Sequence, residues 1–193
     1  MPELPEVETI VRTLAPRLEG RRIVTIRTQT KKPWAATVGR AAGQGIHAVR
    51  RYGKYILIEL DRGFLAIHLG MTGRLSFGGE PGPHTRCELL LNAGRLRFDD
   101  ARQFGSVRWI EQELSHLGPD ALEVSAEEFI TRLRRRKGRI KSLLLNQRFL
   151  RGIGNIYADE ALFRARIHPL AEAPRLSRER ALRLHGAIRR VLS

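Results

Sequence analysis

The hydrophobic pattern of the chain changes its period near residue 117, and this change constrains the fold more than any other feature. Before it, short runs rich in Ile, Leu, Val and Phe follow one another closely and are separated by Gly and Pro, as strands are. After it, apolar residues recur at helical spacing. The pattern predicts strands at residues 22–28, 46–50, 55–60, 64–68, 74–77, 87–92, 95–98 and 107–111. It predicts helices at residues 126–135, 140–146, 156–164 and 177–192.

A further helix is predicted ahead of the strands. Pro2 and Pro5 suit the first turn of a helix, where the missing N–H of proline costs nothing, and acidic residues there complement the helix dipole. An apolar face follows at helical spacing and is formed by Val7, Ile10, Val11, Leu14 and Leu18. In the second half of the chain, Ser125 and Ser177 are the predicted helix N-caps.

The close spacing of the strands favours a sandwich or a barrel-like pair of sheets. The predicted fold class is therefore α+β. It consists of a β-sandwich-like domain with an N-terminal helix at residues 1–111, a linker at 112–125 and an all-α domain at 126–193.

The charge of the chain points to a polyanionic partner. The formal net charge is +15, and residues 126–193 hold 17 Lys and Arg against 6 Asp and Glu. A basic face that is merely solvated is the alternative, but a charge so concentrated in one third of the chain favours phosphate binding. The predicted partner is nucleic acid.

Several other classes are excluded or disfavoured. A single cysteine, Cys87, rules out an internal disulfide and a cysteine-based zinc site within these residues, and it is expected to be an inert core thiol. No apolar run approaches the ~20 residues that a membrane span needs. The acidic N-terminus does not resemble a signal peptide. A cytoplasmic location is expected.

The N-terminus itself carries a possible nucleophile. Removal of Met1 would leave Pro2 as a secondary α-amine, a group that is partly neutral at cellular pH because its ordinary pKa is about 7.7–8.0. Such an amine attacks a sugar carbon at the aldehyde level of oxidation and gives an iminium. Glu3 could move protons at the sugar, and Glu6, one turn along, could hold the amine or a water. The alternative is an ordinary well-started amphipathic helix.

Five motifs in order along the chain resemble the formamidopyrimidine-DNA glycosylase family. They are the N-terminal Pro2-Glu3-Leu4-Pro5-Glu6, the lysine motif Arg51-Tyr52-Gly53-Lys54-Tyr55, the methionine loop His68-Leu69-Gly70-Met71-Thr72-Gly73, the loop Asp100-Ala101-Arg102-Gln103-Phe104-Gly105, and the turn Gly152-Ile153-Gly154-Asn155 of a helix–two-turns–helix element. Each motif alone is of moderate specificity, but together they span nearly the whole chain.

The resemblance implies a bifunctional repair enzyme that excises oxidised purines, such as 8-oxoguanine and formamidopyrimidines, from double-stranded DNA and then nicks the strand at the abasic site. It implies that Pro2 displaces the base and forms a Schiff base at C1′. It also implies that Glu3 is the proton donor at the sugar and that Lys54 assists the elimination.

The remaining predicted site residues contact DNA. Met71 and Phe104 are suited to wedge between base steps after the damaged base is flipped out, although core packing is the usual fate of such residues. The glycines beside them favour exposed loop tips. Asn155 is a predicted N-cap of a helix whose free N–H groups suit a phosphate. The resemblance places four further side chains on DNA: His84, Arg102, Lys137 and Lys141.

The sequence also departs from the family pattern. Ala101, Gln103 and Asn146 stand where members often have Pro, Arg and Asp, so altered affinity is expected rather than a lost mechanism. Most members continue into a four-cysteine zinc finger, which is missing here. We therefore expect a fragment, or else a reduced member with weakened activity. No cofactor is expected in these residues, and one zinc ion is expected in a full-length member.

Two alternatives stay open at this point. A sister enzyme of the endonuclease VIII type acts on oxidised pyrimidines, but Leu4 departs from its usual N-terminus. A non-catalytic damage-binding protein would keep the basic face and the wedge without the nucleophile. A monomer is expected, because a duplex with one flipped base offers no two-fold site.

Overall fold

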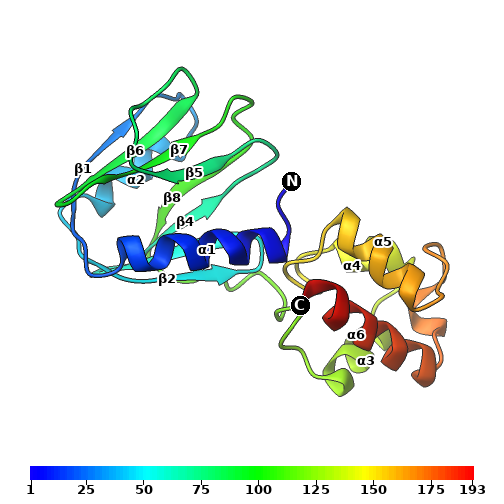
Figure 1. Ribbon diagram of the computed structural model, residues 1–193. Helices are drawn as coiled ribbons and strands as arrows, with labels where there is room; N and C mark the ends of the chain where they lie inside the picture. The colour runs from blue at the N-terminus through cyan, green and yellow to red at the C-terminus, as the bar shows by residue number, and fades with distance from the viewer. The chain divides into compact units, whose positions relative to one another are not determined.

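The computed structural model describes residues 1–193 (Figure 1). The chain divides into two compact units. The first contains Met1–Pro2 and Glu6–Leu114, and the second contains Glu3–Pro5 and Ser115–Ser193. The sequence had placed all of residues 1–111 in the first domain, and nothing in its pattern indicated that residues 3–5 pack with the second.

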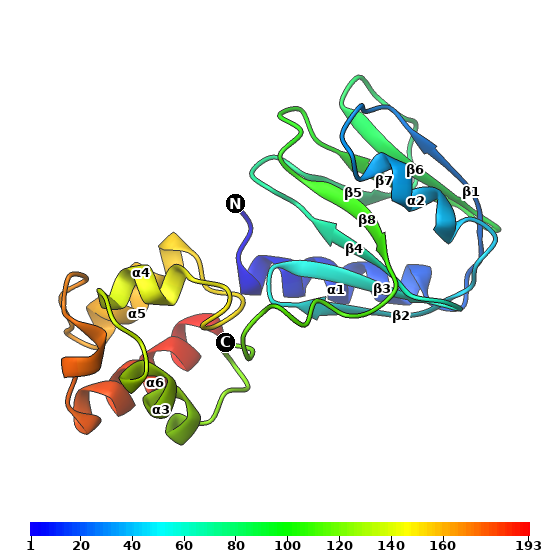
Figure 2. The same ribbon diagram turned by 180° about the vertical axis from the view of Figure 1, so that it is seen from behind.

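The first unit contains a long helix and two four-stranded antiparallel sheets, which Figure 2 shows from behind. Helix α1 spans Leu4–Leu18. One sheet has the strand order β1-β6-β7-β5 and the other β2-β3-β4-β8. The strands are β1 (Ile23–Thr28), β2 (Ile46–Tyr52), β3 (Tyr55–Leu60), β4 (Phe64–His68), β5 (Arg74–Phe77), β6 (Thr85–Leu91), β7 (Arg95–Asp99) and β8 (Ser106–Ile110). All eight predicted strands and the first helix are thus confirmed.

Both sheets share one apolar core with α1. Val7, Val11, Leu14 and Leu18 of the predicted apolar face are buried in it, beside Ile56 and Ile58 of β3 and Leu89 and Phe98 of the other sheet. Ile10 is only partly buried at its edge. Burying one face of each sheet against the helix and the opposite sheet is the arrangement that alternating patterns require.

Two short helical elements were not predicted. Helix α2 spans Ala35–Val38, and a 3₁₀ turn spans Gly39–Ala41. Periodicity over four residues cannot be told from chance, because the apolar stripe of a helix shows only over two turns or more. The packing of Val38 and Ala41 in the core explains why these turns form.

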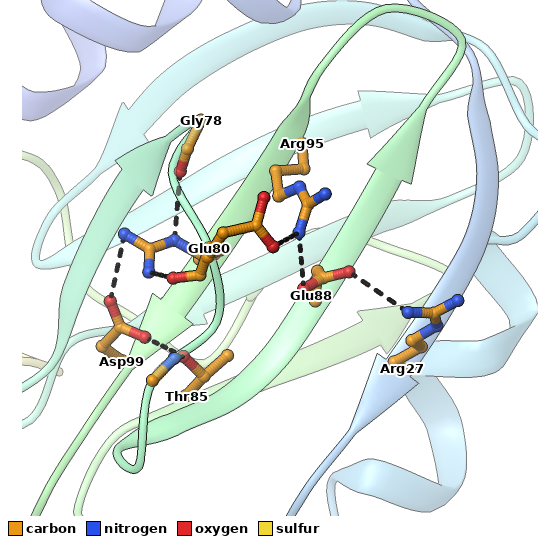
Figure 3. A network of polar contacts seen from close by, with 9 residues as sticks. Arg27, Gly78, Glu80, Thr85, Glu88, Arg95 and Asp99 are labelled. Atoms are coloured by element: carbon orange, nitrogen blue, oxygen red, sulfur yellow. Dashed lines mark hydrogen bonds and ion pairs between the residues drawn. The ribbon is translucent and has the colours of Figure 1, made fainter.

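A network of ion pairs covers part of the β1-β6-β7-β5 sheet (Figure 3). Glu88 of β6 is buried, and its carboxylate lies 3.9 Å from Arg27 Nη1 and 3.6 Å from Arg95 Nη1 on the neighbouring strands. Arg95 also pairs with Glu80 at 3.1 Å. Cross-strand pairs of opposite charge stabilise adjacent strands, so we regard this network as structural.

The second unit is helical. It contains α3 (Ala126–Arg134), α4 (Ile140–Leu145), α5 (Asn155–Arg164) and α6 (Arg178–Leu192), with a 3₁₀ turn at Ala173–Arg175 before α6. Ser125 Oγ accepts the Glu128 N–H at 3.2 Å, and Ser177 Oγ accepts the Arg180 N–H at 3.3 Å, so both predicted N-caps are confirmed. The core contains Leu4 together with Phe129, Phe149 and apolar residues of all four helices. None of the helices is both long and apolar enough to cross a membrane.

Candidate active site and nucleic-acid interface

The Glu3 side chain lies at the N-terminus of helix α5. Glu3 is buried, and its Oε2 atom accepts the Gly154 N–H at 2.6 Å and the Tyr157 N–H at 3.4 Å, while Oε1 accepts the Ile156 N–H at 2.9 Å. A carboxylate is the group that complements the positive end of a helix and its unpaired N–H groups. Residue 3 is therefore fixed to the turn 152–154, and the Pro2 nitrogen is one residue away along the chain.

This contact corrects the prediction made for Asn155. The N-cap of α5 is Gly154, which has no side-chain capping bond, and Asn155 is the first helical residue. The N–H groups of Ile156 and Tyr157, predicted to be free for a phosphate, are bound by Glu3. The pattern missed this because the capping carboxylate comes from the opposite end of the sequence. A DNA contact by Asn155, which is exposed, stays a prediction.

Gly152 holds the main chain next to Glu3. Its carbonyl accepts the Leu4 N–H at 3.1 Å, and its φ of +111° lies in a region that side chains disfavour. A Cβ on Gly152 would also stand 2.6 Å from Leu4 Cδ1. Both facts explain why this turn needs glycine at position 152.

Gln147 braces the same turn and was not singled out by the sequence analysis. Its Oε1 atom accepts the Gly152 N–H at 2.9 Å. Its Nε2 atom donates to the carbonyls of Ile153 at 2.7 Å and Leu145 at 3.1 Å. A glutamine between two apolar helices is a weak signal in the sequence, and only the folded turn shows that both ends of the amide are used.

Lys54 lies at the tip of the β2–β3 hairpin. Tyr52 and Tyr55 pair across it, which leaves Gly53, at φ +64°, and Lys54 as the turn residues. Lys54 is buried. The Tyr55 ring lies 4.9 Å from the imidazole of His68 between centroids. Burial lowers the pKa of His68, and the charge of Lys54 and then that of Arg108 lower it further. His68 Nδ1 accepts the Gly70 N–H at 3.2 Å, which fixes the start of the methionine loop.

The two predicted wedge residues are exposed. Met71 is 54% exposed and Phe104 56%, so neither packs in the core, and the loop-tip interpretation is confirmed. Their loops touch through glycines, since a Cβ on Gly70 would stand 2.6 Å from the Gly105 nitrogen. The guanidinium of Arg102 lies 4.7 Å from the centroid of the Phe104 ring.

The basic side chains predicted to bind phosphate differ in exposure and in ion pairing. Lys137 and His84 are exposed on loops. Lys141 of α4 is partly buried, and its Nζ atom lies 2.8 Å from Oδ1 and 2.9 Å from Oδ2 of Asp159 on α5. Lys141 was predicted to contact DNA, but its partner Asp159 could not be predicted from the sequence, because the two residues are on different helices.

Two other features bear on cofactors. Cys87 is buried in β6, and burial, assisted by the charge of Glu88, raises its pKa to about 12. No cluster of three or more His, Cys, Asp or Glu side chains is arranged to hold a metal ion.

Sequence profiles of two domains match the chain. Residues 1–107 match the formamidopyrimidine-DNA glycosylase N-terminal domain, and residues 117–193 match the formamidopyrimidine-DNA glycosylase H2TH domain. The formamidopyrimidine-DNA glycosylase of Solibacter usitatus is 51% identical over 202 residues, which covers all of this chain and 76% of that protein.

Solved structures give the same likeness. The MutM (Fpg) protein from Thermus thermophilus superposes with a TM-score of 0.89 at 41% identity, covering 99% of this chain and 74% of that one. The Lactococcus lactis formamidopyrimidine DNA glycosylase, solved non-covalently bound to DNA containing an abasic site, gives a TM-score of 0.88 at 30% identity, covering 98% of this chain and 80% of that one.

Proposed function

We propose, since the chain belongs to the formamidopyrimidine-DNA glycosylase family, that it removes oxidised purines through a Schiff base on Pro2. Family membership makes the chain a DNA glycosylase and abasic-site lyase whose partner is damaged double-stranded DNA. The proposal concerns which of its residues carry out each step. It also includes action in the cytoplasm, on the chromosome of a bacterial cell.

The observation that carries the proposal is the docking of Glu3 on helix α5. Three backbone N–H groups hold its carboxylate at the Gly154 turn, and the Leu4 N–H is bound to Gly152. The residue after Pro2 is therefore held by backbone bonds, which order the end of the chain before substrate arrives. Preorganisation of a nucleophile and its proton carrier lowers the barrier without any change in the chemistry.

The reaction begins once Met1 is removed. The neutral Pro2 nitrogen attacks C1′, the bond from C1′ to the base breaks, and the base leaves with the bonding electrons. The nitrogen loses its proton to Glu3, which returns a proton to the sugar oxygen as the ring opens and the iminium forms. The iminium is an electron sink, so C2′ loses a proton to solvent, the C2′–C3′ double bond forms, and the C3′–O bond to the 3′ phosphate breaks by β-elimination. Lys54 serves as the proton donor to the departing phosphate oxygen.

DNA is held by the loops and cations. Met71 and Phe104 fill the space that the flipped nucleotide leaves, and Arg102 faces the orphaned base. Phosphates are bound by His84, Lys137, Lys141 and Asn155. Exposure of both apolar loop tips supports the wedge, because neither side chain is buried in the core and both are accessible to a base stack. A zinc ion is expected only in members that extend into a zinc finger.

The test is trapping of the covalent intermediate. The chain is incubated with a duplex that contains one 8-oxoguanine opposite cytosine, and borohydride is added to reduce any iminium. A covalent band that maps to the N-terminal peptide, and that Pro2→Gly abolishes, is the expected result. A duplex with a preformed abasic site serves as the positive control for the lyase step.

Two outcomes would change the proposal. No band with either duplex, from protein whose N-terminal peptide has the mass expected for Pro2 first, would rule out Pro2 as the nucleophile. Faster excision of thymine glycol than of 8-oxoguanine would move the chain to the oxidised-pyrimidine specificity of the endonuclease VIII type.

A further inference from the structure

A buried carboxylate joins the loops that carry the proposed wedge. Asp100, directly after β7, is 1% exposed. Its Oδ1 atom accepts the Thr72 hydroxyl at 2.5 Å, and its Oδ2 atom accepts the Gly105 N–H at 2.8 Å. Thr72 follows Met71, and Gly105 follows Phe104, so each oxygen holds the residue next to one of the two exposed apolar tips.

The main chain of Asp100 extends this connection to a third segment. Its N–H donates to the His84 carbonyl at 2.8 Å, and its carbonyl accepts from Arg86 Nε at 2.9 Å. Thr72 Oγ1 in turn accepts the Arg102 N–H at 3.3 Å. Four proposed DNA-contacting residues are therefore linked to Asp100. The carbonyl of His84 binds its N–H, the Arg102 N–H binds its partner Thr72, and the two tips, Met71 and Phe104, directly precede Thr72 and Gly105.

Other hydrogen bonds hold these loops one at a time: the Gly73 N–H donates to the Leu69 carbonyl at 2.8 Å, and the Thr30 hydroxyl donates to Gln103 Oε1 at 2.8 Å, whereas the Asp100 carboxylate binds both loops. The loops that carry Met71 and Phe104 contain Gly70, Gly73 and Gly105, and loops with glycine lose much conformational entropy when they order. Both tips project into solvent instead of packing on the core. A buried carboxylate that accepts two hydrogen bonds costs a great deal when either is lost, so it holds both donors in one arrangement.

We propose that Asp100 is a positioning residue that joins the methionine loop, the Arg102–Phe104 loop and the His84 segment into one rigid unit that enters the DNA together. This inference rests on the proposed function, since it presupposes that Met71 and Phe104 are the wedge. In the proposed function, both tips enter the space that the flipped nucleotide leaves. If the loops moved independently, the conformational entropy lost when they order would add to the free-energy barrier of that step.

The experiment compares two rates in the same protein. Asp100→Asn keeps the shape of the side chain but removes its charge. Its NH₂ group cannot accept from the Thr72 hydroxyl or from the Gly105 N–H, so one charge-assisted bond is lost, and at most a weaker bond donated to Thr72 Oγ1 replaces it. Single-turnover excision of 8-oxoguanine opposite cytosine is measured beside lyase cleavage of a preformed abasic site. We expect excision to fall about tenfold or more and abasic cleavage to change less than about threefold, because an abasic nucleotide has no stacked base to displace.

A second readout follows base flipping directly. A 2-aminopurine next to the lesion brightens when the stack opens, and we expect Asp100→Asn to slow this rise by the same factor as excision. Thr72→Val removes the hydroxyl that binds Oδ1 while keeping the shape of the side chain. If both variants act through that bond, the double variant is no slower than Asp100→Asn alone.

Glu88→Gln is the matched control. Glu88 is also a buried carboxylate of the first unit, but its partners are arginines of the ion-pair network in Figure 3. We expect it to leave the ratio of the two rates unchanged whatever it does to thermal stability. A purely structural role for Asp100 would give the same result, with both rates falling in proportion to the folded fraction, and would overturn the inference.

Failure of the proposed function is recognised separately. Met71→Ala and Phe104→Ala test the wedge itself. If these variants excise slowly while Asp100→Asn excises at the parental rate, the wedge stands and the role of Asp100 is refuted. If Met71→Ala and Phe104→Ala excise at the parental rate, the wedge is wrong, and the inference about Asp100 is overturned with it.

Discussion

The carboxylate of Glu3 accepts the Gly154 N–H at 2.6 Å, across 151 positions of sequence. This bond fixes the residue next to the proposed nucleophile to the first turn of α5. The side chain proposed to move protons therefore also caps a helix, so one carboxylate contributes both to catalysis and to the stability of the fold.

Glu3→Gln should therefore lower both activity and stability. A glutamine amide keeps one acceptor oxygen, while its NH₂ faces N–H donors, so at least one of the three bonds is lost. We expect the unfolding free energy to drop by about 1–3 kcal/mol and base excision to fall by about 100-fold or more. Denaturant titration and single-turnover incision measure the two effects. Glu111→Gln, at an exposed position, is the control, and a Glu3→Gln protein of parental stability would contradict the capping role.

Gln147→Glu should weaken the turn that binds the N-terminal segment. A carboxylate oxygen would replace Nε2 and face the carbonyls of Leu145 and Ile153, so two donated bonds would become repulsive contacts. We expect the free energy of unfolding to fall by about 2 kcal/mol and the borohydride-trapped complex to form more slowly. Gln112→Glu adds the same charge at an exposed site and should change neither. Parental trapping kinetics in Gln147→Glu would show that the turn needs no brace.

Local signals explain which parts of the fold could be predicted from the sequence. Strand runs between glycines and the serine caps at Ser125 and Ser177 depend on neighbouring residues, and these predictions were confirmed. The N-cap of α5 could not be found in this way. Asn155 has the composition of a cap, but the helix uses a carboxylate from residue 3, which only the tertiary fold brings near.

The candidate site divides in the same manner. The residues predicted to contact DNA or the sugar, such as Met71 and Lys54, lie inside short motifs, and a family resemblance can be recognised from such short stretches. The positioning role of the residues that hold them in place was not predicted. Asp100 stands inside one of the quoted motifs, but its partner Thr72 lies 28 residues away, and no local pattern connects them.

The Lys141–Asp159 ion pair should restrain DNA binding. The Lys141 ammonium lies 2.8 Å from the Asp159 carboxylate, so a phosphate must share or displace that partner. We expect Asp159→Asn to bind duplex DNA about two- to fivefold more tightly at low salt, and Lys141→Met to bind more weakly with a shallower dependence on salt, by about one counterion. Fluorescence anisotropy over a salt series measures both. Glu179→Gln also removes one exposed negative charge, and an equal gain from it would show that only net charge matters.

Cys87 should be inert in the folded protein and should make stability fall at high pH. Burial raises its pKa from 9.0 to about 12, so the unfolded chain loses the proton first as the pH rises, and the contribution of the thiol to stability declines between these values. We expect no reaction with a thiol reagent at about pH 8 without denaturant. Unfolding free energies of the parent and Cys87→Ala should converge as the pH rises above 9.0. Rapid labelling of the native protein would contradict the burial of this side chain.

His68 should make stability fall on the acid side. Its pKa is lowered from 6.5 by burial first and then by the charges of Lys54 and Arg108, so below that pH the unfolded chain takes a proton that the folded chain resists. The contribution of His68 is therefore complete above pH 6.5 and is lost as the pH falls through the lowered folded pKa. Protonation at Nδ1 would also break the bond from the Gly70 N–H that fixes the methionine loop.

The measurement is the melting temperature between pH 8 and about pH 5, beside the rate of 8-oxoguanine excision. His68→Gln should lose the part of the acid destabilisation that the parent shows. His168 is a matched control, because its Nδ1 atom accepts the Leu170 N–H at 3.2 Å in the same two-residue pattern, but it is exposed. His168→Gln should keep the parental acid profile. If it flattens the profile as much as His68→Gln does, the local bond would be responsible, and the burial of His68 beside Lys54 would not be.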